Sequence, residues 1–183
     1  LGGNLIAGGF FASADGVFGK VSNIASFDGT GWNPMGSPAL GATNGVVTAL
    51  AVHNGELYAG GQFTKIGNVL ANRIAKYDAT GNTWIPLGTG IQGTSFTRVN
   101  ALISFGGMLF AGGIFDQAGP LTGLASLAAW NGSSWVNVGN PGGLPAAGNR
   151  PINAFINFGG TLFAGGDFNN GVFKVARYSG GAS

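Results

Sequence analysis

The sequence contains no cysteine and few charged residues. Its 183 residues include 8 Lys and Arg, 6 Asp and Glu and a single His, which gives a net charge of +2. Without thiols the chain has neither a disulfide framework nor a thiolate metal site. So weak a positive charge does not hold a phosphate backbone, and we therefore expect no nucleic-acid partner.

A long hydrophobic run is also missing. The longest apolar stretch, 99–115, is interrupted by Ser104 to Gly107 and again by Gly112-Gly113, and it is too short for comfortable membrane spanning. Any export signal would have been removed or lie outside the chain, because the first residues already belong to the repeat described next. With 45% hydrophobic residues, including 14 Phe and 4 Trp, the chain has ample material for a folded core.

An internal repeat dominates the sequence. Ala-Gly-Gly begins at Ala7, Ala59, Ala111 and Ala164, at offsets of 52, 52 and 53 residues. A second landmark recurs at nearly the same step, with offsets of 50, 53 and 48 residues, and ends in an aromatic residue followed by a polar one: Ile24–Asp28, Ile74–Asp78, Leu127–Asn131 and Val175–Ser179. Three copies add a tryptophan and three add an opening motif of the type Val-Thr-Ala-Leu: Trp32, Trp84, Trp135, Val47–Leu50, Val99–Leu102 and Ile152–Phe155.

The repeat predicts four short strands, which we name A to D in chain order. Apolar runs rich in Val, Ile, Phe and Tyr alternate with Gly, Asn and Asp, which is typical of strands and hairpins. Asn54-Gly55, Gly106-Gly107 and Gly159-Gly160 suit the type I′ turn of a two-residue hairpin between A and B. A polar turn such as Asp78–Asn82 joins C to D, and D carries the Trp. One unit is thus a four-stranded antiparallel meander.

A single meander leaves apolar side chains uncovered, so radial stacking of the units is the expected solution. We therefore expect an all-β chain, a β-propeller of four-stranded antiparallel blades of about 52 residues, in one segment with four blades started. The units run roughly over 1–45, 46–97, 98–150 and 151–183. Leu1-Gly2-Gly3 corresponds to the hairpin tip Phe158–Gly160, so the first blade lacks strand A, and the last lacks strand D. The expected sheets hold three, four, four and three strands, and such unfinished ends favour self-association or a longer repeat array.

These residues carry a family resemblance. A strand ending in Gly-Gly, then an aromatic-Asp pair such as Tyr77-Asp78, then Trp84 about six residues on, resembles the kelch repeat of about 50 residues. The Ala before the Gly pair and the long B to C loop are similar to the Gly-rich variant of secreted bacterial surface proteins. The resemblance covers essentially the whole chain and implies a propeller fold. A competing likeness, the Asp-box of sialidase-type propellers, fits only the copy from Ser26 to Trp32 well.

Few residues are candidates for chemistry. The acids stand mostly at equivalent turns, so we interpret them as turn caps, with Asp15, Asp116 and Asp167 as the ones to test for catalysis. His53, the one histidine, precedes a hairpin turn and is expected to be a solvated residue rather than a metal ligand. The copper oxidases of the kelch type need Tyr, His and Cys together, so that activity is not expected here. We predict no catalytic residues, no metal and no cofactor.

A few positions are candidates for recognition. Arg98 and Arg150 stand just before strand A in successive units, where we expect a ligand-facing loop between blades. Trp130 joins them because other copies carry Phe or Tyr there, although recurring aromatics are more often core wedges. Asn131-Gly132-Ser133 satisfies the glycosylation pattern in an exposed C to D turn.

The first functional hypothesis is a non-enzymatic extracellular or cell-surface module for binding or scaffolding, with carbohydrate or another surface protein as its partner. The second is a structural subunit that assembles into a surface fibre or sheath by strand or blade complementation. A propeller hydrolase or lyase is a third, lesser alternative.

Overall fold

Strands are the regular structure of this chain. The structure, a computed structural model, describes residues 2–14, 17–18, 21–36, 43–139, 151–167 and 175–178, and it has no helix in them. Every strand pair recorded in these ranges is antiparallel. The prediction of an all-β chain is thereby confirmed. No helix long and apolar enough to cross a membrane occurs among the described residues.

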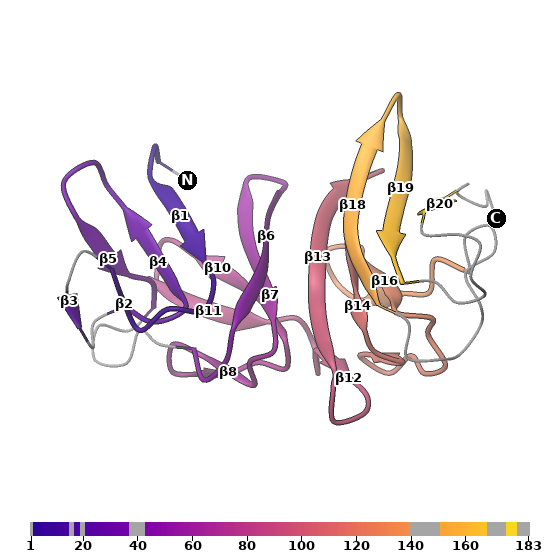
Figure 1. Cartoon of the computed structure of the whole chain (residues 1–183), viewed down its shortest axis with the longest axis horizontal. Coiled ribbons are helices and arrows are strands. Elements are labelled where there is room, and N and C mark those ends of the chain that lie inside the picture. Colours follow the sequence, from indigo (N-terminus) through magenta and orange to yellow (C-terminus); the bar gives the residue numbers. More distant parts are fainter. Residues whose placement is uncertain are drawn as a thin grey trace. The chain divides into compact units, whose positions relative to one another are not determined.

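The chain divides into two units, Leu1–Gly90 and Ile91–Ser183, and each unit contains two of the larger sheets (Figure 1). The first sheet has the order β1-β4-β5, with β1 Leu5–Gly8, β4 Ile24–Phe27 and β5 Trp32–Pro34. The second has the order β6-β7-β10-β11, with β6 Val47–His53, β7 Glu56–Gly61, β10 Ile74–Asp78 and β11 Thr83–Pro86. Two ribbons accompany them, β2 Ser13–Ala14 with β3 Val17–Phe18, and β8 Lys65–Ile66 with β9 Val69–Leu70.

The second unit repeats this organisation. Its first sheet has the order β13-β14-β16-β17, with β13 Arg98–Phe105, β14 Met108–Ile114, β16 Leu127–Trp130 and β17 Trp135–Val136. Its other sheet has the order β18-β19-β20, with β18 Ile152–Phe158, β19 Thr161–Gly166 and β20 Val175–Tyr178. A ribbon pairs β12 Ile91–Gln92 with β15 Gln117–Ala118. The four sheets therefore hold three, four, four and three strands in the described residues, and the predicted order of A to D is confirmed.

The hairpins between strands A and B have the predicted turn. Asn54 and Gly55 have φ values of 51° and 79°, and Gly106-Gly107 and Gly159-Gly160 repeat the pattern. Two consecutive positive φ values are the mark of the type I′ turn, whose twist matches that of the flanking strands. Gly2 and Gly3 show the same pair, 61° and 85°, just before β1.

The loops between strands B and C are more ordered than the sequence suggested. In the first two repeats they fold back as the short ribbons β2-β3 and β8-β9, where only an irregular loop was expected.

Strand A also carries a feature that the sequence did not predict, a β-bulge at its second residue. The register shifts there between Val47 and Ala49, and at the equivalent points of β13 and β18.

In each unit the described residues include a core that the two sheets share. In the first unit, Ile24 and Met35 of the first repeat pack into a cluster with the second repeat, which contributes buried apolar residues from every strand of its sheet and from the segment between β7 and β10: Val47, Leu57, Ala59, Phe63, Ile66, Ala71, Ala75 and Trp84. In the second unit the equivalent cluster joins residues of both sheets: Phe110, Leu127, Ala129, Ile152, Leu162, Ala164 and Ala176. Because a sheet has to bury its apolar face against another element, this sharing is what makes each pair of sheets stable.

The Gly pairs at the end of strand B permit close approach of the next sheet. A Cβ atom placed on Gly8 would lie 2.7 Å from Cγ1 of Val47, and one placed on Gly112 would lie 2.5 Å from Cγ2 of Ile152. Neither glycine has a positive φ, so available space and not backbone conformation requires glycine here. In both units the opening residue of one strand A thus packs onto the glycine of the preceding sheet.

Candidate functional site

Two of the acidic residues described by the structure, Asp28 and Asp78, cap turns as the sequence predicted, while the carboxylate of Glu56 forms an ion pair with Lys76. Oδ1 of Asp28 accepts hydrogen bonds from the backbone N–H of Thr30 at 2.8 Å and of Gly31 at 3.0 Å, and from the Thr30 hydroxyl at 2.7 Å. These bonds favour the carboxylate and lower the pKa of Asp28 below its ordinary value. Asp78 accepts a bond from the backbone N–H of Thr80 in the same way.

The remaining acids do not gather into a site in the described residues. No group of three or more His, Cys, Asp or Glu side chains able to hold a metal occurs in the ranges that the structure covers. Asp116 lies between Phe115 and β15, where its carbonyl accepts the N–H of Leu124, and Asp167 follows β19. Asp15 lies outside the described residues.

His53 does not have the surroundings expected from the sequence. The prediction of a solvated hairpin residue is wrong, because the side chain is only 1% exposed. Its ring lies edge-on to Tyr58 with centroids 6.0 Å apart, and its Nε2 lies 3.2 Å from the amide nitrogen of Asn54. A histidine at the end of β6 can therefore belong to the core although it precedes a surface turn. Strand alternation was the available sequence signal, because His53 shares a face of β6 with Ala51 and Ala49 and points away from the face of exposed Val52.

Arg98 belongs to a strand and not to the expected loop. It is the first residue of β13 and pairs with Ile114. Its Nε donates to Oδ1 of Asn100 at 2.9 Å, and the Asn100 amide donates to Oδ1 of Asn153 at 2.8 Å and to the carbonyl of Ile152 at 3.2 Å. Asn100 and Asn153 are the bulged residues of β13 and β18, so the bulges turn their side chains into one polar row. Arg150, the other predicted member of the ligand-facing loop, lies outside the described residues.

Trp130 lies in the core. It is 9% exposed and its ring packs against Trp135 across β16 and β17 at a centroid distance of 5.5 Å. Phe27 with Trp32, at 5.4 Å, makes the equivalent pair in the first sheet. This arrangement favours the core wedge, the alternative that the sequence analysis weighed against recognition.

Asn131 lies in the exposed turn that the sequence predicted. Its side-chain oxygen accepts bonds from the backbone N–H of Ser133 at 3.0 Å and of Ser134 at 2.9 Å. The turn is the amide counterpart of the one at Asp28. The capping role uses the side-chain oxygen of Asn131.

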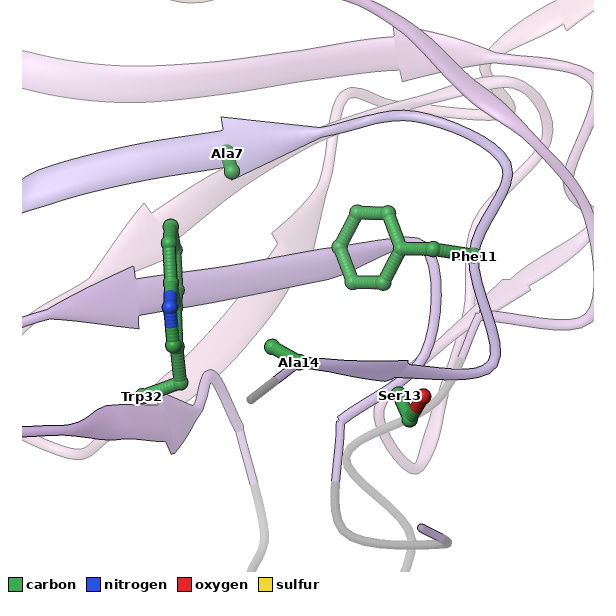
Figure 2. A pocket seen from close by; sticks show the side chains of 5 residues that line it. All are labelled: Ala7, Phe11, Ser13, Ala14 and Trp32. Atoms are coloured by element: carbon green, nitrogen blue, oxygen red, sulfur yellow. The ribbon is translucent and has the colours of Figure 1, made fainter. Parts of the chain in front are cut away.

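A pocket on the first sheet was not predicted from the sequence. A cavity of about 270 Å³ is lined by Ala7 of β1, Phe11, Ser13 and Ala14 of the following segment, and Trp32 of β5. In Figure 2 the rings of Trp32 and Phe11 stand on opposite sides of this cavity. Both aromatic side chains are only half-buried, unlike their counterparts in the second sheet.

The lining repeats, 52 residues on, inside the core of the first unit. The residues equivalent to the five lining positions are Ala59, Phe63, Lys65, Ile66 and Trp84. Trp84 is 2% exposed, its indole N–H donates to the carbonyl of Met35 at 3.1 Å, and a Cβ on Gly36 would lie 3.1 Å from its ring. The turn at Met35-Gly36, which follows β5, therefore covers Trp84. The pocket beside Trp32 is the open counterpart of this covered position.

Comparison with known proteins adds no family. No protein-family model matches the chain, and no curated protein matches it.

Proposed function

We propose that this chain is a segment of a kelch-like β-propeller that serves as an extracellular or cell-surface module for binding or scaffolding, with no catalytic role of its own. The observation that carries the proposal is the contact repeated in both units between strand A of one sheet and the glycine of the sheet before it. The side chain of Val47 packs on Gly8, and the side chain of Ile152 packs on Gly112. A single packing rule applied to successive sheets is what a radial stack of blades requires.

The tryptophan of strand D supports the same proposal. The indole N–H of Trp84, in the second sheet, donates a hydrogen bond to the Met35 carbonyl of the preceding repeat and so links the first two repeats. A large aromatic ring buried between two sheets contributes much of the energy of such a joint. The repeat residues are thus used for stacking, which leaves the edges and loops of the blades for recognition.

The polar row of Arg98, Asn100 and Asn153 is the part of the described surface that we propose for recognition. Its guanidinium and amide groups offer several donors in a fixed arrangement, which suits the hydroxyls of a carbohydrate or the backbone of a surface protein. Arg98→Ala removes the guanidinium and leaves the strand intact. Lys65→Ala is the matched control, because it removes one positive charge from the ribbon β8-β9.

Two measurements test the proposal. Antibody labelling of the cells that make the protein should be equal before and after permeabilisation if the module stands on the surface. The fluorescently labelled wild-type chain should bind to intact cells. The Arg98→Ala variant should bind less, and the Lys65→Ala variant should bind as much as the wild type. Labelling only after permeabilisation, together with no binding to intact cells, would contradict it.

A second candidate function, a subunit of a surface fibre or sheath, is favoured by one observation. The two three-stranded sheets expose large apolar side chains, among them Leu5, Ile156 and Val175. Exposed apolar patches of this kind mark surfaces for association. The hydrolase or lyase alternative has its own test, since a hydrolytic activity lost in Asp116→Asn or Asp167→Asn would establish it.

A further inference from the structure

The side chains of the polar row have one consistent hydrogen-bond orientation. The Ile152 carbonyl can only accept, so the Asn100 atom that lies 3.2 Å from it is the amide nitrogen. The Asn100 oxygen is then turned towards Arg98, whose guanidinium can only donate and whose Nε lies 2.9 Å away. The Asn153 oxygen accepts from the Asn100 nitrogen at 2.8 Å. Rotation of the Asn100 amide by half a turn would break these bonds, so the row holds Arg98 in a defined position.

Arg98 is held in the row without a carboxylate partner. The ion pair recorded among the described residues joins Lys76 to Glu56, and the recorded side-chain bond of Arg98 uses its Nε. A guanidinium also has N–H groups on both Nη atoms, and these have no partner within the described part of the chain. Arg98 is half-buried and Asn153 is exposed, so the row lies at the surface. The Nη groups of Arg98 are therefore available to a ligand.

The two Nη groups of Arg98 match the shape and the charge of a carboxylate. Two parallel N–H bonds from a guanidinium to the two oxygens of a carboxylate are charge-assisted, and they are stronger than bonds between neutral groups. A hydroxyl or an amide carbonyl offers a single oxygen without a full charge and uses this planar fork less well. Because Asn100 already orders the guanidinium, binding costs less side-chain entropy. The row therefore suits a carboxylate better than a neutral sugar.

The strands that carry the row favour a sugar over a peptide as the bearer of that carboxylate. β13 and β18 are each the outer strand of their sheet, and a peptide can add to an outer strand as a further strand. Both strands are bulged at the row, where the register shifts between Val99 and Ala101 and between Ile152 and Ala154. A bulge interrupts the ladder and turns an edge away from further pairing. A sugar needs no such ladder, because side chains alone bind it.

We propose that Arg98 binds the carboxylate of a uronic acid in an acidic polysaccharide, and that Asn100 is the positioning residue of this site. The inference rests on the proposed function, because it names the class of carbohydrate that the surface module binds. Asn100 holds the guanidinium through Nε, which leaves both Nη groups for the two carboxylate oxygens.

An NMR titration of the full chain with trigalacturonate, a short uronic-acid oligomer, tests the site. Trigalacturonate should shift the signals of the Arg98 Nε–H and of the Asn100 side-chain amide. Its methyl-esterified form is the matched probe, because it has the same sugar rings without the carboxylates, and it should bind weaker by roughly tenfold or more. Triglutamate carries the carboxylates on a peptide and should also bind more weakly. Triglutamate binding as tight as that of trigalacturonate would overturn the choice of a polysaccharide.

Variants of the row separate the binding residue from the positioning residue. Arg98→Ala should raise the Kd for trigalacturonate by roughly tenfold or more, and Arg98→Lys should raise it nearly as much, because lysine keeps the charge but lacks the planar fork. Asn100→Ala should raise the Kd severalfold, whereas a merely structural role would lower its melting temperature and leave the Kd unchanged. If circular dichroism shows that Asn100→Ala is unfolded, Asn153→Ala, at an exposed position, replaces it and should also raise the Kd. Lys65→Ala, on the ribbon β8-β9, should bind like the wild type.

Three results would overturn the site. These are equal binding of the two forms of the trisaccharide, an Arg98→Ala variant that binds as tightly as the wild type, and an Arg98→Lys variant that does so, because charge alone would then suffice. A wild-type chain that binds intact cells but not trigalacturonate would overturn this site alone and leave the surface module standing.

Discussion

Substitution of Gly112 by alanine should destabilise the second unit by overpacking. The added Cβ would lie 2.5 Å from Cγ2 of Ile152, 2.9 Å from its Cβ and 2.7 Å from Cζ of Phe155. The Phe155 ring can rotate away, but the Cβ of Ile152 is fixed to the backbone of β18. Relief therefore requires the two sheets to move apart, which exposes apolar surface of the shared core.

The size of the effect follows from that geometry. Overpacking by one methyl group costs about 1 to 3 kcal/mol when neighbours must shift. For a chain of this length that corresponds to a fall in melting temperature of roughly 2 to 12 °C. Gly8→Ala should behave similarly, because its Cβ would lie 2.7 Å from Cγ1 of Val47. Agreement between the two sites would show that both units use one stacking rule.

The assay is thermal unfolding followed by near-ultraviolet circular dichroism, with urea unfolding as a second measure of stability. Gly31→Ala is the matched control, because a Cβ there meets nothing within 4 Å and the residue lacks a positive φ. The control should unfold within a few tenths of a kcal/mol of the wild type. A Gly112→Ala variant as stable as the control would refute the close packing of β14 against β18.

Three further predictions concern single side chains. Trp84→Ala should lower the free energy of unfolding by about 3 to 5 kcal/mol, because it removes a buried ring and leaves the Met35 carbonyl without its donor. Urea unfolding should show a smaller loss for Trp32→Ala, because Trp32 is only half-buried. The pKa of Asp28 is lowered, so its contribution to stability is complete above the ordinary pKa of a carboxyl group and is lost as the pH falls below it. Asp28→Asn should keep the turn, and its melting temperature should fall less than that of the wild type between about pH 6 and about pH 2. An equal fall in both proteins would count against the capping role. Burial and the nearby Glu56 carboxylate raise the pKa of Tyr58 to about 12. The stability that depends on the neutral Tyr58 phenol is therefore complete below the ordinary tyrosine pKa and is lost as the pH rises towards 12. An absorbance titration of Tyr58→Phe should lack the tyrosine ionisation step that occurs at the highest pH in the wild type.

Much of the sheet organisation could be predicted because each signal is local. Asn54-Gly55 specifies its turn through two residues that accept positive φ, and the Trp that recurs in three repeats identifies strand D. The strand order follows from such turns, since short connections make neighbours in sequence neighbours in the sheet. The number of strands in each sheet was therefore correct in the described residues.

What sequence reasoning missed depends on contacts between distant residues. The bulge after Val47 moves Thr48 out of the ladder, and no local pattern distinguishes it from a regular strand. Arg98 seemed to precede its strand because a charged residue at a strand start resembles a loop residue. The pocket beside Trp32 was missed because three of its five lining residues, Ala7, Phe11 and Trp32, recur 52 residues later at buried core positions, so the repeat pattern predicts core there as well.

The most direct test of the account is a nuclear Overhauser measurement on the isotopically labelled chain. If one stacking rule joins the sheets, the Hα protons of Gly8 should show cross-peaks to the Val47 γ1 methyl, and those of Gly112 to the Ile152 γ2 methyl. Both sets of cross-peaks should be present at a concentration where the chain is monomeric. Their absence in a folded, fully assigned sample would contradict the claim that the sheets of successive repeats stack as blades.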